Sequence, residues 1–85
     1  MTTLDRNIRQ FVLRALLASK DAPLPDDTLK GTIRAAFPNV AFTDGDLTQH
    51  IKELEAAGII AGTNDDISGV VWQLSLKGKI KAQQL

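Results

Sequence analysis

The segment TDGDLTQHIKELEAAGII, residues 43–60, contains a helix with recognisable signals at both ends. Thr43 is a preferred N-cap residue, and Asp46, three positions later, completes a variant of the capping box. Gly58 lies where helices commonly end in a left-handed residue. These signals predict a helix over residues 44–57 that presents only one narrow apolar face. The residues on that face are Leu47, Ile51, Leu54 and Ala57.

Two further helices are predicted before this segment. Apolar residues with the spacing of an amphipathic helix run from Leu4 to Ser19. The prolines in residues 22–25 cannot continue a helix and predict a turn. Acidic residues at a helix start and a second apolar stripe then predict a helix from Asp26 to Phe37. The chain is therefore expected to form three helices before Gly58.

A β-hairpin is predicted after the third helix. Residues 59–61 are a short apolar run, residues 63–69 are rich in turn-forming residues, and residues 70–74 alternate between two faces. Trp72 lies on the apolar side of this alternation, which favours a place in the core over stacking on a base or a partner. Residues 76–80 fit either a last short helix or an extended tail, because Gly78 lowers the helical propensity.

Two leucines of the first helix, Leu13 and Leu17, lie outside its main apolar stripe. They are four residues apart and are therefore neighbours on one strip of the helix surface. One interpretation is a dimer interface formed by the two ends of the chain, with Ile80 and Leu85 as further candidates. The other interpretation is that Ile80 and Leu85 cover the two leucines within a single chain.

The composition is that of one ordinary globular domain. With 85 residues, of which 44% are hydrophobic and 24% charged, the chain has room for one core and differs from disordered sequences. It contains no cysteine, which excludes disulfides and thiolate metal sites. The beginning of the chain lacks the pattern of a secretory signal, and no stretch reaches the roughly 18 apolar residues of a membrane span. A cytoplasmic location is expected.

No catalytic site and no cofactor are expected. The sequence contains no glycine-rich phosphate loop, no nucleophile paired with a base and no cluster of metal ligands. His50 is the only histidine and has no cysteine with which to complete a mixed metal site. The carboxylate pairs at residues 26–27 and 65–66 fall at a helix start and in a turn, where such residues usually cap a helix or are solvated.

Two stretches carry a family resemblance. Residues 46–60, DLTQHIKELEAAGII, place a polar triplet before an apolar-x-x-Leu segment that ends in Ala-Gly-apolar. Residues 72–79, WQLSLKGK, contain a Leu-Ser-x-x-Gly-basic pattern. Both resemble bacterial winged-helix repressors of the arsenical-resistance and multiple-antibiotic-resistance types, in the recognition helix and in the end of the second wing strand. The resemblance implies a mainly α winged helix-turn-helix domain over residues 1–85, a three-helix bundle plus a two-stranded wing.

The same resemblance implies a DNA-binding regulator of transcription, often dimeric, that places helix 44–57 in the major groove. In that family the third helix reads base edges, while the second helix and the wing hold phosphates. The resemblance nominates Thr48, Gln49, His50 and Lys52 for the groove, and Lys30 and Arg34 for phosphate contacts. The alternative is that these residues are only the solvent-facing sides of amphipathic helices.

The charge distribution disagrees with DNA binding on that face. The chain carries ten basic and ten acidic residues, but residues 43–75 hold six acidic residues and a single basic one, Lys52. Phosphate would repel such a surface. Positive charge collects instead near the two ends, at Arg6, Arg9, Arg14 and Lys20 and at Lys77, Lys79 and Lys81.

This distribution favours an alternative function, a winged-helix module for protein–protein interaction or dimerisation without DNA readout. The leucine strip on the first helix points in the same direction. A role as an accessory part of a larger assembly also stays open, since the fold alone does not specify a function.

Overall fold

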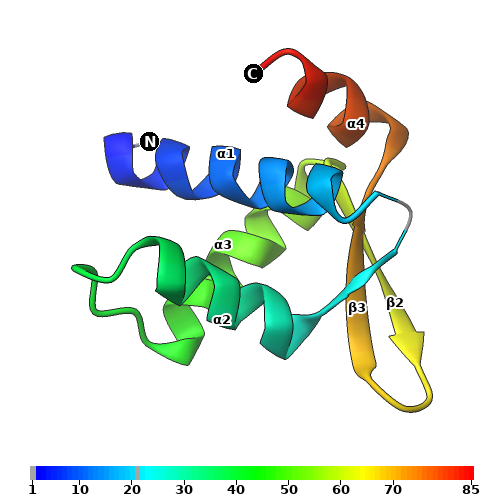
Figure 1. Ribbon diagram of the computed structural model, residues 1–85, viewed down its shortest axis with the longest axis horizontal. Coiled ribbons are helices and arrows are strands. Elements are labelled where there is room, and N and C mark those ends of the chain that lie inside the picture. The colour runs from blue at the N-terminus through cyan, green and yellow to red at the C-terminus, as the bar shows by residue number, and fades with distance from the viewer. Residues whose placement is uncertain (1, 21) are drawn as a thin grey trace.

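Three helices, a hairpin and a fourth helix follow one another in the computed structural model, which describes residues 2–20 and 22–85 (Figure 1). A short strand before the second helix joins the hairpin, so that the described chain is a small α+β domain with a three-stranded antiparallel sheet. The three predicted helices and the hairpin are present, and a last short helix is the correct alternative for residues 76–80. The elements are α1 (Thr3–Ala18), β1 (Leu24–Pro25), α2 (Asp26–Ala36), α3 (Asp44–Ala56), β2 (Ile60–Asp65), β3 (Gly69–Leu74) and α4 (Leu76–Gln83).

Capping boxes start both α1 and α3. At α3 the Thr43 side chain accepts a hydrogen bond from the backbone N–H of Asp46 at 3.1 Å, and the Asp46 carboxylate accepts one from the N–H of Thr43 at 3.0 Å. Thr2 and Asp5 make the same pair of contacts at α1. Gly58 follows α3 with a φ of 76°, a left-handed conformation that glycine adopts without strain. The predicted start of α3 is confirmed, and its end lies one residue before the predicted one.

The sheet has the order β1-β3-β2, with β3 in the centre. The sequence predicted only a turn at residues 22–25, but Leu24 pairs with Trp72 and Pro25 with Val71. Proline is tolerated there because β1 is an edge strand, which needs no donor on its free side. Two residues are too few for a periodic signal, so only the pairing with β3 makes this segment a strand.

The hairpin is longer than predicted. β2 and β3 stay paired as far as Asp65 and Gly69, so the turn covers only residues 66–68, and the prediction of a loop over 63–69 is wrong. Asp65 closes the turn, since one of its carboxylate oxygens accepts the backbone N–H groups of Ile67 at 3.2 Å and of Ser68 at 2.8 Å. These hydrogen bonds, those from Ser68 first, lower the pKa of Asp65.

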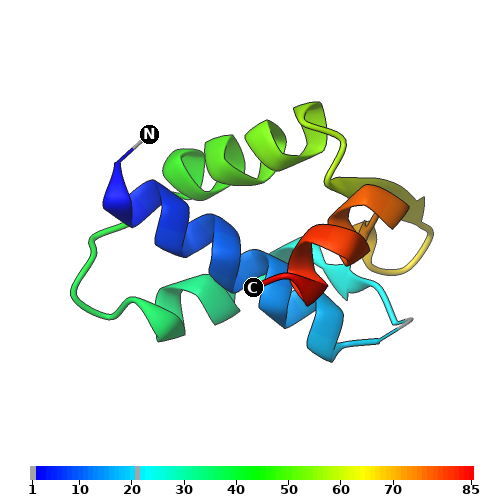
Figure 2. The ribbon, with the colours of Figure 1, turned by 90° about the horizontal axis from the view of Figure 1, so that it is seen from above.

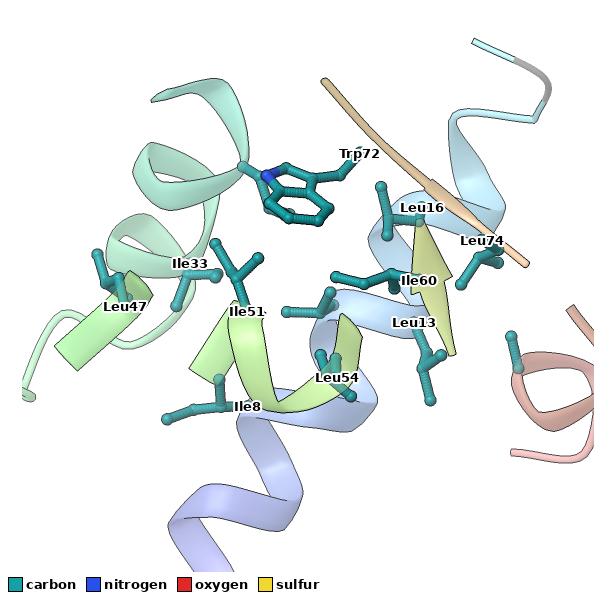
Figure 3. Close-up of a cluster of buried hydrophobic side chains, with 13 residues drawn as sticks. Ile8, Leu13, Leu16, Ile33, Leu47, Ile51, Leu54, Ile60, Trp72 and Leu74 are labelled. Carbon is teal, nitrogen blue, oxygen red and sulfur yellow. The ribbon is translucent and has the colours of Figure 1, made fainter. Parts of the chain in front are cut away.

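The hydrophobic core lies between the helices and the sheet (Figure 3). Trp72 is 3% exposed, which confirms its predicted place in the core. Its indole lies across Gly62 of the neighbouring strand, where a Cβ would come within 2.7 Å of the ring. The remaining core side chains are Ile8, Val12, Leu13, Leu16, Leu29, Ile33, Leu47, Ile51, Leu54, Ile60, Leu74 and Ala82.

α4 packs against α1 (Figure 2), and a glycine allows its close approach to the start of the hairpin. A Cβ on Gly78 would lie 2.0 Å from the backbone oxygen of Ile59. Ser75 caps the helix by accepting the backbone N–H of Gly78 at 3.0 Å. Gly78 therefore serves the packing of α4, and its effect on helical propensity is secondary.

Leu13 and Leu17 are covered within the chain. Leu13 is 6% exposed in the core, and Leu17 packs against the core. Packing within one chain is thus the correct interpretation of Leu13, which cannot form a dimer interface in this fold. On α4, which packs against α1, Ala82 is buried, whereas Ile80 and Leu85 remain 50% and 48% exposed.

Candidate functional site

His50 lies on another side of α3 than Thr48 and Lys52, two of the side chains nominated for a DNA groove. Its side chain is 16% exposed, and its Nε2 is 3.9 Å from a carboxylate oxygen of Asp5 on α1. Its ring also packs edge-on against Phe42, with the ring centroids 6.5 Å apart. His50 therefore belongs to the contact between α1 and α3 and does not face a groove together with Lys52.

An open pocket of about 310 Å³ lies between α1 and α3 beside His50. Carboxylates are prominent in its lining, but each is already engaged. Asp5 and Asp46 cap the starts of α1 and α3, and hydrogen bonds with the capping threonines lower the pKa of both carboxyls. Glu53 forms an ion pair with Arg9, and this contact lowers the pKa of Glu53. The full lining is Leu4, Asp5, Val40, Phe42, Asp46, Gln49, His50 and Glu53.

The pocket lies between the first turn of α1, the loop before α3 and α3 itself. The Nδ1 of His50 is buried and has no hydrogen-bond partner among the residues that the structure describes. Catalytic and metal-bound histidines normally have such a partner to orient the ring. Within residues 2–20 and 22–85, no three His, Cys, Asp or Glu side chains are grouped so that they could hold a metal ion.

Lys30, which was nominated for phosphate, is enclosed by carboxylates. Its Nζ lies 2.9 Å from an oxygen of Asp26 and 3.3 Å from an oxygen of Asp44, and its side chain is 12% exposed. The hydrogen bond with Asp26 raises the pKa of Lys30, although burial acts in the opposite direction. Burial would raise the pKa of Asp26, but hydrogen bonds from Lys30 and from the indole of Trp72 lower it overall. Lys30 thus ties α2 to the start of α3, and two carboxylates lie beside its charge.

Lys52 and Thr48 lie together beside the sheet. They line a second pocket, of about 150 Å³, together with Trp72. The Nζ of Lys52 lies 3.4 Å from an oxygen of Glu55 and 5.8 Å from the centre of the Trp72 ring, and the side chain is 63% exposed. Lys52 is accessible, but a carboxylate of the same helix lies next to it.

Gln49 and Arg34 complete the nominated set. Gln49 is exposed and donates a hydrogen bond to Glu53 at 3.3 Å. Arg34 is exposed near the end of α2, and among the described residues it has no ion-pair partner. The structure therefore brings Thr48, Gln49 and Lys52 to the accessible part of α3 and leaves Arg34 as the one nominated cation without a carboxylate beside it in the described chain.

The turn between β2 and β3 exposes an apolar side chain that was not among the residues nominated from the sequence. Ile67 is 95% exposed, and Asp65 and Asp66 precede it. A signal was available, because an isoleucine among the polar residues of a turn has no core position to occupy. Residues 65–68 are called the acidic turn below.

A second exposed apolar surface lies on α4. Leu76 is 76% exposed and Ile80 is 50% exposed, and the two are one helical turn apart. Lys77 and Lys79 lie between these two residues in the sequence, and Lys81 follows Ile80. Residues 76–85 are called the α4 surface below. The acidic turn and the α4 surface lie at opposite ends of β3 (Figure 1).

No helix in the described ranges of the chain is both long enough and apolar enough to cross a lipid bilayer. Comparison of the chain with models of protein families, with curated proteins and with solved structures found no match.

Proposed function

We propose that the chain is a winged-helix domain that binds protein and does not read DNA. The order of its elements supports the fold, since three helices are followed by a hairpin, as in the repressors that the sequence resembles. We expect it to act in the cytoplasm, as the sequence predicts.

The observation that carries this proposal is the charge of the surface where DNA would dock. Lys30 is enclosed by two carboxylates, and Lys52 lies beside a third. The hairpin adds Asp65 and Asp66 and no basic residue. Phosphate neutralisation supplies nearly all non-specific DNA affinity and a large share of specific affinity, so this surface would be repelled by a duplex.

The lysines of α4 do not compensate for this charge. Lys77 lies at the end of α3, where its Nζ donates to the backbone oxygen of Ala57 at 3.0 Å, but α4 is at the opposite end of β3 from the hairpin turn (Figure 1), so these lysines do not offset the carboxylates of the turn. Exposed apolar side chains at Ile67, Leu76 and Ile80 fit a protein partner better than a nucleic acid.

DNA binding through α3 is the second candidate, and one observation favours it. Thr48 and Lys52 line one pocket beside the sheet, and Gln49 is exposed on the same helix. Glutamine can make a bidentate contact with adenine, and the exposed Arg34 could reach a phosphate from α2.

A fluorescence-anisotropy titration of the full chain with a labelled random-sequence duplex distinguishes the two functions. It is performed at about 50 mM and about 200 mM salt, because phosphate contacts weaken steeply over this range. We expect no binding at either salt concentration. Binding that weakens with salt, that is lost in Gln49→Ala with Lys52→Ala and that is retained in the control Lys20→Ala would overturn the proposal in favour of DNA readout.

A further inference from the structure

The acidic turn presents one large side chain that the chain itself does not cover. Ile67 is 95% exposed, and the neighbouring Asp66 has no ion-pair partner among the described residues. Asp65 is used within the turn, where it accepts two backbone N–H groups and so keeps the turn in one conformation. Covering this isoleucine side chain on association is favourable, because apolar surface is removed from water. The acidic turn therefore presents an exposed apolar side chain next to negative charge.

The α4 surface has the complementary character in the same molecule. Leu76 and Ile80 form an apolar pair on the solvent side of the helix. Residues 76–85 contain three lysines and no acidic residue. The Nζ of Lys77 donates to the backbone oxygen of Ala57 at 3.0 Å, and among the described residues no carboxylate forms an ion pair with it.

Charge decides how two copies of the chain can use these surfaces. A symmetric contact of α4 with α4 would bring the lysines of both helices together without an acidic residue between them, and like charges oppose such a contact. A contact of the acidic turn with α4 instead pairs opposite charges. It also covers Ile67, Leu76 and Ile80 at once, which no symmetric contact of α4 alone does.

The acidic turn and the α4 surface of one molecule cannot meet each other. β3 runs from the turn to α4 (Figure 1), and its six residues span about 20 Å at roughly 3.3 Å per residue. β3 is also the central strand of the sheet, paired on both sides, so it cannot bend back. A contact between the two surfaces must therefore be made between molecules.

We propose that the acidic turn of one molecule docks on the α4 surface of a second copy of the chain, so that molecules associate head to tail. The proposal of this contact rests on the proposed function, and it specifies that the protein partner is a second copy of the chain. The contact is heterologous, so each bound molecule keeps a free turn or a free α4, and association continues into rings or chains. A turn on a single helix covers less than the about 1,600 Å² of a standard interface, so the association is weak and depends on concentration.

Sedimentation equilibrium of the full chain tests this contact. The weight-average mass is expected to rise continuously between about 20 µM and about 1 mM, the range in which a weak contact becomes populated. Raising the salt from about 50 mM to about 500 mM should lower the mass, because the charges that meet lie near the surface. A chain that stays monomeric up to about 1 mM at the lower salt overturns the proposal.

Charge exchange shows whether these two surfaces are the ones that meet. Asp66→Lys places a cation beside Ile67 and brings the charge of residues 65–68 from minus two to zero, and Lys77→Glu with Lys81→Glu changes the charge of the three lysine positions of α4 from plus three to minus one, so each variant alone should stay monomeric. An equimolar mixture should associate again, because the new lysine beside Ile67 meets the glutamates of the variant α4 and the remaining two surfaces are unchanged. A mixture that stays monomeric contradicts the proposal.

Matched controls separate this effect from net charge and from folding. Asp27→Lys, and Arg6→Glu with Arg14→Glu, change exposed charges elsewhere and should associate like the unmodified chain. Circular dichroism melting verifies that every variant folds. If the controls lose association as fully as the test variants, the contact is not the one proposed. A chain that neither associates nor binds DNA overturns the head-to-tail contact alone, whereas DNA binding through Gln49 and Lys52 overturns the proposed function.

Discussion

The indole Nε1 of Trp72 donates a hydrogen bond to a carboxylate oxygen of Asp26 at 2.9 Å, which links β3 to the first residue of α2. Asp26 also forms an ion pair with Lys30, and Lys30 reaches Asp44 at the start of α3. One line of polar contacts thus connects the sheet with two helices. Because Trp72 is buried, its N–H group needs this partner.

Removing the carboxylate should therefore destabilise the fold. We expect Asp26→Ala to lower the free energy of unfolding by about 2 kcal/mol, because the indole N–H loses its acceptor and Lys30 keeps only Asp44. Urea denaturation followed by circular dichroism measures the change. Asp27→Ala, at the exposed neighbouring position, should stay within about 0.5 kcal/mol. Equal losses in the two variants would contradict the role given to Asp26.

Acid should weaken the same contacts. The pKa of Asp26 is lowered on folding, so its contribution to stability is present above its unfolded pKa of about 3.9 and is lost as the pH falls through the folded value. We expect the melting temperature to fall steeply below about pH 4. Asp26→Asn should be less stable near neutral pH and should lose less stability in acid. Parallel melting curves for the two proteins between about pH 2 and pH 7 would count against this assignment.

Gly78→Ala should destabilise the chain although alanine favours helices. The added Cβ would lie 2.0 Å from the backbone oxygen of Ile59, so α4 must move, at a cost of about 3 kcal/mol. Gly31→Ala in α2 is the matched control, because nothing lies within 4 Å of its Cβ position. That substitution should raise stability by about 0.5–1 kcal/mol through helical propensity. Thermal and urea denaturation of both variants measure the difference, and a stabilising Gly78→Ala would show that α4 does not pack as described.

Ile67→Ser should separate association from stability. Because the side chain is 95% exposed, the free energy of unfolding should change by less than about 0.5 kcal/mol. Head-to-tail association should weaken about tenfold, since the apolar side chain that docks on the α4 surface is lost. Denaturation and sedimentation equilibrium on the same sample measure both quantities. A large loss of stability would mean that Ile67 packs within its own molecule.

α3 was predictable because its signals are local. The residues that cap its start lie three positions apart and contact each other, so the sequence contains both partners of the interaction. The acidity of residues 43–75 was equally accessible, because a sum of charges requires no coordinates. The separation of His50 from Thr48 could also have been predicted, since residues two positions apart lie about 200° apart around a helix.

The features that were not predicted depend on partners far away in the sequence. β1 is a strand only because β3 lies beside it, and Gly78 is required only because Ile59 passes close to α4. For Lys30, the ion pair with Asp26 four positions earlier could have been read from the sequence, but the contact with Asp44 of the next helix could not. Composition and periodicity describe one element at a time, whereas these contacts are made between elements.

The position of Trp72 gives the chain a built-in optical reporter. It is the only tryptophan, and the chain has no tyrosine, so the near-ultraviolet emission arises from one buried ring between α2, α3 and the sheet. A ligand that engages Thr48 and Lys52 would alter the surroundings of this ring and shift the emission. Docking at the acidic turn or at the α4 surface would leave it unchanged. The unlabelled protein can thus report which of its surfaces is occupied.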